Sequence, residues 1–107
     1  MDTNAGSSEK HETPYKMVYS DGLLTVGFSK PTTNQILVEY VSNEIHKMNI
    51  PSGTMLKING PSSVAVAYTI ALSIGSRFKE IAIFDPNMKG YIVVKGSEVH
   101  ELGSIIS

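Results

Sequence analysis

The first residue set with the chemistry of a binding site is the segment Asn59-Gly60-Pro61-Ser62-Ser63, which follows an expected strand and precedes an expected helix. Glycine lets a ligand approach the backbone closely, and proline suits the first turn of a helix. The serine hydroxyl groups stand beside the free amides of a helix N-terminus, which attract phosphate. The alternative is an ordinary capped helix start, because the sequence has neither the Walker nor the dinucleotide-binding glycine pattern.

A second candidate is Asp85-Pro86-Asn87, at the carboxyl end of an expected strand over 80–84. Open α/β sheets place their ligand crevices at this end of their strands. An aspartate there can accept a proton, bind a divalent cation or hydrogen-bond a ribose hydroxyl. An aspartate before a proline also commonly begins a turn, so both interpretations of Asp85 stay open.

Cations and imidazoles form the third candidate set. Arg77, the only arginine, ends the second expected helix, where its guanidinium group could hold a phosphate or cap helix carbonyls; we slightly favour capping. His46 is expected on the solvated side of the first helix, and His100 in a polar loop. Neither His100 nor His11, which falls in the N-terminal tail, has helix-imposed metal-ligand spacing, so we assign no metal ligands. The residues define neither a Ser-His-Asp order nor a pair of carboxylates.

Short strands and two helices must position these candidates. Strands over 16–19 and 23–28, joined by a Ser-Asp-Gly turn, predict an opening hairpin. The spacing of Thr32 and Gln35 is that of a capping box and begins an amphipathic helix that ends near Asn49. A strand over 55–59 leads to a second helix over 64–78, which is apolar almost all round and is therefore expected to be buried. Strands over 80–84, 91–95 and 105–106 follow.

The order of these elements predicts the fold class. Two successive βα units require parallel pairing through right-handed crossovers, while the hairpins add antiparallel strands. We therefore expect an α/β protein with a small mixed β-sheet, made of an opening hairpin, two βα units and a closing hairpin, and with two main helices.

The composition limits the class of protein. A length of 107 residues allows one domain, and the lack of cysteine excludes disulfides, cysteine-based zinc sites and a thiolate nucleophile. The formal net charge of −1 argues against a protein that coats long nucleic acid. The longest apolar-rich stretch, 64–74, falls short of the ~20 residues that span a bilayer. We expect a cytoplasmic protein, with the soluble part of a longer membrane effector as the alternative.

Residues 1–14 are polar, with Met1 and Ala5 as their only apolar side chains, and are expected to form a flexible N-terminal tail. Residues 15–107 are expected to form a single domain. Its 93 residues include 8 basic and 7 acidic side chains, so the domain is slightly positive.

The order and spacing of several segments resemble the small CRISPR-associated ring nucleases of type III systems, which act on cyclic tetra-adenylate. The segments are Lys57 to Pro61, the second helix, Ile81 to Pro86, Gly90 to Val94 and Gly103 to Ile106, and the resemblance covers about Tyr15 to Ile106. It implies homodimers, two of which sandwich the cyclic RNA as a homotetramer, with cleavage favoured by manganese. It also implies a catalytic role for Asp85.

The sequence departs from the family pattern in three places. The family's arginine after the Asp-Pro pair is replaced by Asn87, and an extra residue near Lys89 lengthens the next turn. The family's catalytic histidine should fall within residues 73–79, which contain none. Ser76 cannot act as the base, and loss of acid–base assistance typically costs on the order of 10²–10⁴ in rate. We therefore expect binding rather than efficient cleavage.

The leading hypothesis is a cyclic tetra-adenylate sensor domain or sink in antiviral defence. The alternatives are an active ring nuclease that uses His100 or His46 from a neighbouring subunit, and a structural oligomer that binds no nucleotide. The predicted ligand-binding residues are Asn59, Gly60, Pro61, Ser62, Ser63, Ser76, Arg77, Lys79, Asp85 and Asn87.

Overall fold

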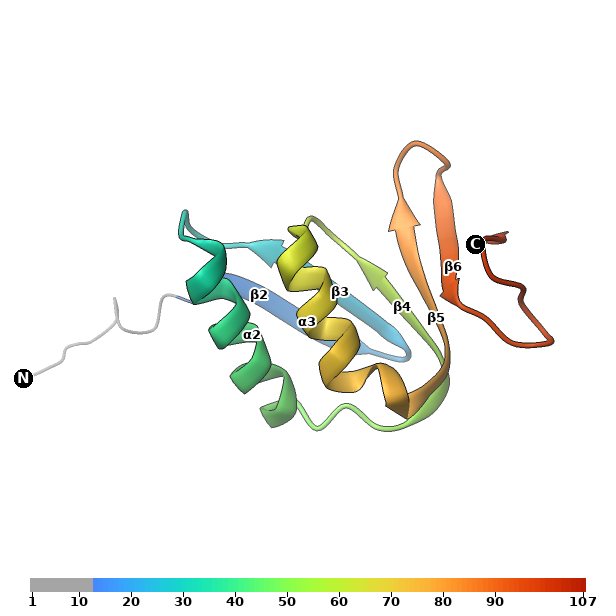
Figure 1. The fold of residues 1–107 in the computed structure, drawn as a ribbon, viewed down its shortest axis with the longest axis horizontal. Coiled ribbons are helices and arrows are strands. Elements are labelled where there is room, and N and C mark those ends of the chain that lie inside the picture. Colours follow the sequence, from blue (N-terminus) through green and yellow to red (C-terminus); the bar gives the residue numbers. More distant parts are fainter. Residues whose placement is uncertain (1–12) are drawn as a thin grey trace, which may run out of the picture.

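The computed structural model describes residues 13–107 and places two helices side by side on one face of a six-stranded sheet (Figure 1). In chain order the elements are β2 (Tyr15–Ser20), β3 (Leu23–Phe28), α2 (Asn34–Lys47), β4 (Gly53–Asn59), α3 (Val64–Ile74), the 3₁₀ turn η1 (Gly75–Arg77), β5 (Phe78–Asp85), β6 (Gly90–Lys95) and β7 (Ile105–Ile106).

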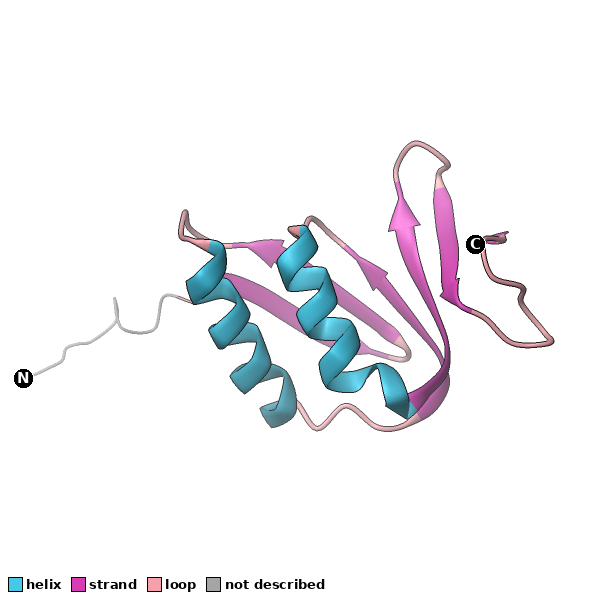
Figure 2. Ribbon diagram, in the orientation of Figure 1, coloured by secondary structure: helices cyan, strands magenta, loops and turns pink. Residues whose placement is uncertain are grey.

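The strands lie in the sheet in the order in which they occur in the chain, β2 to β7. The pairs β3–β4 and β4–β5 are parallel, and each is joined through a helix, whereas β2–β3, β5–β6 and β6–β7 are antiparallel. The predicted α/β class, with a small mixed sheet and two main helices, is confirmed. Figure 2 shows that β5 and β6 extend beyond the area that α3 covers.

The hydrophobic core lies between the two helices and strands β2 to β5. It takes alternate residues of the strands and one face of each helix, because side chains alternate along a strand and recur every three to four residues on a helix. The most deeply buried members include Leu24, Leu56, Val41, Ile45 and Ile74.

The first helix begins one residue later than the capping-box spacing indicates. Thr33, rather than Thr32, is the N-cap, and its hydroxyl oxygen accepts a hydrogen bond from Ile36 N at 3.3 Å. Thr33 has the extended backbone that an N-cap requires. Lys47 ends the helix, close to the expected Asn49, whose φ of 56° cannot continue it.

The second helix is shorter and more exposed than the sequence predicts. It ends at Ile74, because Gly75 to Arg77 tighten into the 3₁₀ turn and Phe78 is already the buried first residue of β5. Only one face, with Val66, Ile70 and Ile74, is buried. The opposite face is exposed because no other element of residues 13–107 packs on it, and it carries Val64, Tyr68 and Leu72, exposed by 75%, 68% and 85%.

Of the predicted tail, residues 1–12 lie outside the described part of the chain. Pro14, which was placed in the tail, already joins the domain, since its carbonyl oxygen accepts a hydrogen bond from Ser29 N at 3.0 Å. Within residues 13–107, no helix combines the length and the apolar character needed to cross a bilayer.

Candidate functional site

The turn from β4 into α3 is held in place by the neighbouring strand β3. Gly60 has a φ of +126°, and a Cβ atom added to it would lie 1.8 Å from the carbonyl oxygen of Val26. The glycine has a structural reason that does not depend on a ligand, and the predicted approach of a ligand to Gly60 stays a prediction. The glycine is required because β3 occupies the space that any side chain would need.

The N-terminus of α3 is capped by Ser63, whose Oγ accepts a hydrogen bond from Val66 N at 3.2 Å. The other amides of the first turn, those of Val64 and Ala65, have no acceptor within the helix. They point out of the helix beside the exposed Ser62, and the positive end of the helix dipole favours an anion there. The site thus combines an ordinary cap with free donors that suit phosphate.

Tyr15, the first residue of β2, holds this turn in place although it lies far from the turn in the sequence. Its hydroxyl group donates a hydrogen bond of 2.7 Å to the carbonyl oxygen of Pro61, and its ring packs edge-on against Phe28 with 5.3 Å between the centroids. Burial raises the pKa of Tyr15 to about 12, and a hydrogen bond with Ser62 offsets part of this rise. The sequence gives no signal for this contact, because the two partners are 46 residues apart.

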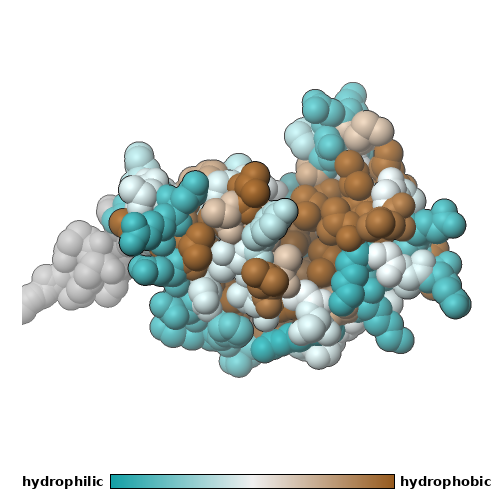
Figure 3. Space-filling model, in the orientation of Figure 1, coloured by the Kyte–Doolittle hydropathy of each residue, from teal (hydrophilic) through white to brown (hydrophobic). Residues whose placement is uncertain are grey.

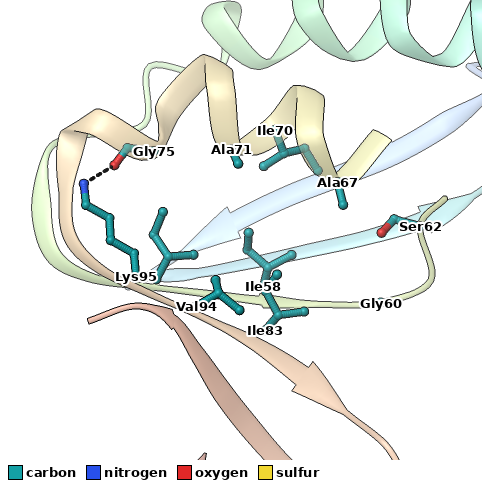
Figure 4. A pocket seen from close by; sticks show the side chains of 11 residues that line it. Ile58, Gly60, Ser62, Ala67, Ile70, Ala71, Gly75, Ile83, Val94 and Lys95 are labelled. Atoms are coloured by element: carbon teal, nitrogen blue, oxygen red, sulfur yellow. Dashed lines mark hydrogen bonds between the residues drawn. The ribbon is translucent and has the colours of Figure 1, made fainter. Parts of the chain in front are cut away.

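A groove of about 300 Å³ runs between α3 and the uncovered part of β5 and β6, starting at this turn. Gly60 and Ser62 line one end, and apolar side chains form most of its walls (Figure 4). At the other end, Lys95 Nζ donates to the carbonyl oxygens of Gly75 at 2.9 Å and Phe78 at 2.6 Å. The apolar lining residues are Ile58, Ala67, Ile70, Ala71, Ile81, Ile83 and Val94.

The groove belongs to a larger hydrophobic surface. Figure 3 shows apolar surface gathered between α3 and the β5–β6 hairpin. Ile83 and Val94 are 37% and 48% exposed on the strand side, and the exposed face of α3 borders the helix side. Since α3 contains no charged residue, the helix adds no charged side chain to this surface, which is therefore an exposed apolar patch.

Asp85 and Asn87 lie at the same edge of the sheet as the β4–α3 turn, because β4 and β5 are parallel and pair as far as Ile58 with Ile83. Asp85 Oδ1 accepts hydrogen bonds from Asn87 N at 2.8 Å and Met88 N at 3.3 Å. Of the two interpretations left open, the structure thus shows Asp85 closing the turn to β6. One carboxylate oxygen remains for a ligand.

Ser76, Arg77 and Lys79 lie at the opposite end of α3, which at 11 residues is about 16 Å long. Arg77 Nη1 donates to the carbonyl oxygen of Ile50 at 2.7 Å and so ties η1 to the segment before β4. The favoured capping of helix carbonyls is not what Arg77 does, because its guanidinium group bonds a loop carbonyl instead. These three residues therefore do not share a site with Gly60 to Ser63 within one chain.

The structure adds a cluster that sequence reasoning did not join. His100 Nδ1 lies 3.0 Å from Glu80 Oε2, and the hydroxyl group of Ser97 donates to the same carboxylate. This cluster lies at the start of β5, whereas Asp85 is its last residue, about 17 Å away along the strand. His46 is exposed on α2, as its spacing predicts.

Residues 13–107 of one chain do not provide a set of ligands for the manganese ion that the family resemblance implies. Residues 13–107 bring together no group of three or more histidine, aspartate or glutamate side chains that could hold a metal ion. Asp85 also uses one of its oxygens in the turn. We therefore derive no metal-dependent step.

Comparisons of the chain with protein-family models, with curated proteins and with solved structures give no match.

Proposed function

We propose that this protein binds cyclic tetra-adenylate and acts as a sensor domain or sink for this second messenger in type III CRISPR antiviral defence. The observation that supports it is the groove between α3 and β5–β6, which opens at the N-terminus of α3. An apolar groove suits the flat face of an adenine base, and free helix amides suit the adjoining phosphate. One chain therefore offers both parts of a nucleotide-binding site at one place.

Binding without efficient cleavage follows from the residues around this groove. A general base must lie within about 3 Å of the proton it removes. Neither the residues that line the groove nor the segment from Asp85 to Gly90 include a histidine, and Lys95 uses its ammonium group to hold Gly75 and Phe78. Asp85 remains the only candidate for a catalytic role at this edge.

A ring nuclease remains the second candidate, because His100 is held by a buried carboxylate in the way that catalytic imidazoles often are. Since His100 and Asp85 lie near opposite ends of β5, a second copy would have to bring one of them to the other. Self-association also agrees with the exposed apolar face of α3, so we propose a homodimer or homotetramer. The structural oligomer without nucleotide is the remaining alternative.

The test measures binding and cleavage together. The protein is mixed with cyclic tri-, tetra- and hexa-adenylate, with and without manganese, while thermal stability and linear products are followed. Stabilisation by the tetra-adenylate ring without product supports the sensor or sink. Repeated turnover establishes the nuclease instead, and the lack of any shift with every ring leaves the structural oligomer.

A charge-reversal pair locates the binding site. Ser62→Asp places a carboxylate beside the free amides of α3 at an exposed position, so the affinity for the ring should fall at least tenfold. Ser52→Asp makes the same change at an exposed position before β4, at the far end of the strand, and should leave the affinity unchanged. Equal effects of the two substitutions would refute this location.

A further inference from the structure

The sheet carries a second pocket that is distinct from the groove beside α3. Its volume is about 450 Å³, which falls in the range of small-molecule sites. Met55, Lys57 and Glu80 line it and share one face of the sheet, because Met55 pairs with Glu80 and side chains alternate along a strand. That face is turned away from the helices, since Leu56 and Ile58 face the core.

A carboxylate–imidazole pair forms the floor of this pocket. Glu80 is the only charged side chain that is fully buried within residues 13–107, with 2% of it exposed. Both of its oxygens contact His100 Nδ1, at 3.1 and 3.0 Å, and Ser97 Oγ donates to one of them. The hydrogen bonds from Ser97 and His100 outweigh burial and keep the pKa of Glu80 below its usual value.

This pair fixes the direction of the imidazole ring. With Nδ1 bonded to Glu80, the opposite nitrogen, Nε2, faces away from the carboxylate on a side chain that is 37% exposed. Nε2 has no hydrogen-bond partner within the described range 13–107. Buried carboxylates hold histidines in this way where the second nitrogen contacts a ligand. The same pair also anchors the loop between β6 and β7 that carries His100.

Two ammonium groups line the same pocket. The ammonium group of Lys79 makes no hydrogen bond or ion pair with any residue from 13 to 107. Lys57 donates to the carbonyl oxygen of Ser107 and lies over the ring of Tyr91, with Nζ 5.3 Å from its centroid. An ammonium group has three donors, so Lys57 keeps donors for a further partner. Lys79 therefore gives the pocket an ammonium group that no other described residue engages, and Lys57 adds a second.

The remaining wall is apolar, formed by Met55, Val99 and Ile106. Cationic donors beside an apolar wall match a ligand that has a phosphate group at one end and a flat apolar part at the other. We infer that this pocket binds a phosphomonoester of mononucleotide size, its phosphate on Lys79, Lys57 and the imidazolium form of His100, in which Nε2 is a donor, and its apolar part against this wall. The inference does not depend on binding of the cyclic ring.

Adenosine 5′-monophosphate, inorganic phosphate and adenosine are the probes, titrated into the full chain while NMR follows the ring protons of His100. We expect saturable shifts with the monophosphate, weaker binding of inorganic phosphate and no binding of adenosine. If inorganic phosphate binds as tightly as the nucleotide, the apolar wall does not contribute to binding, and the site would bind the free phosphate ion rather than a mononucleotide. Equal binding of adenosine and its monophosphate, or no shift at His100 with any probe, would overturn the proposal.

Three variants locate the ligand. Lys79→Ala should weaken binding of the monophosphate about tenfold, which corresponds to the ~1.4 kcal/mol of one lost charged contact. Lys16→Ala, the same change at an exposed position of β2, should have no effect. Ser62→Asp, which tests the ring site, should also leave this binding unchanged. Loss of binding in Lys16→Ala to the same extent as in Lys79→Ala would mean a nonspecific charge effect and would refute the pocket.

Discussion

Replacing Gly60 by alanine tests the reason for the shape of the β4–α3 turn. Two separate features of this residue oppose a side chain. Its φ is +126°, and a Cβ atom added to it would lie 1.8 Å from the carbonyl oxygen of Val26. Because that oxygen belongs to the backbone of β3, a strand paired on both sides, it cannot turn aside as the end of a flexible side chain would. Both features therefore oppose any side chain at this position.

The two costs add. An L-residue in this backbone region costs about 1–3 kcal/mol. Real Cβ atoms essentially never come closer than 3.0 Å to another heavy atom, so the turn has to move by roughly 1 Å from β3, and forced overpacking of this kind costs about 1–3 kcal/mol. We expect Gly60→Ala to lower the free energy of unfolding by the sum of the two, about 2–6 kcal/mol. At about 4–8 °C per kcal/mol, the melting temperature should fall by roughly 20 °C.

Other glycines of the chain separate the two costs. Gly103 has a φ of +87° with no atom within 4 Å of the added Cβ, so its alanine variant measures the backbone cost alone. Gly96 has an ordinary φ but close backbone neighbours, with Leu102 N at 2.7 Å, so it measures the contact alone. Gly27 has neither and serves as the control.

Urea unfolding followed by circular dichroism gives the free energy of each variant. We expect Gly60→Ala to lose about as much as Gly103→Ala and Gly96→Ala together, and Gly27→Ala to lose little. If Gly60→Ala is no less stable than Gly103→Ala, the contact with β3 is not what requires a glycine at position 60. The close approach would then have to be explained by a ligand, as the sequence suggested.

Three further predictions concern the contacts around the two sites. Tyr15→Phe removes the hydrogen bond to Pro61 and should lower the free energy of unfolding by about 1–2 kcal/mol in urea. Burial raises the pKa of folded Tyr15 to about 12. The contribution of the tyrosine to stability is therefore present below the ordinary tyrosine pKa of about 10 and is lost as the pH rises through 12. The free energy of unfolding of the phenylalanine variant should not show this loss at alkaline pH. The pKa of Glu80 is lowered, so its contribution is present above the ordinary glutamate value and is lost as the pH falls; an acid titration of Glu80→Gln should show a smaller loss of stability than the parent chain. Lys95→Met removes the donors to Gly75 and Phe78 and should cost about 1–2 kcal/mol in thermal unfolding, whereas the exposed Lys16→Met should cost almost nothing.

The fold was predictable because it follows from local patterns. Alternating apolar residues and turn signals place the strands. Because a helix connects β3 to β4 and another connects β4 to β5, each of these two pairs of strands is parallel. Burial of α3 was mispredicted because the composition of a helix does not reveal how many elements pack around it. No element of residues 13–107 packs on the side of α3 opposite its buried face, so that apolar face stays exposed.

The candidate site was only partly predictable. The residues from Asn59 to Ser63 do gather at the edge where Asp85 ends its strand, since the carboxyl ends of parallel strands meet there. Arg77 and Lys79 were assigned to the same ligand because they directly precede the strand that the sequence predicts over 80–84; the structure places Lys79 inside β5. A helix of 11 residues carries the chain to the opposite edge, so nearness to β5 in sequence does not bring these residues to the Gly60 turn.

The positions of the histidine and of the phosphate donors decide which activity one chain can support. The free amides of α3 lie at the edge where β4 and β5 end, whereas His100 is bonded to Glu80 at the start of β5, about 17 Å away along the strand. Acid–base catalysis requires contact between the base and the reacting group, so His100 cannot reach a phosphate that these amides hold in the same chain. Under the proposed function, ring recognition and proton transfer would therefore lie at separate places in one chain, and a substitution at His100 should leave ring binding unchanged.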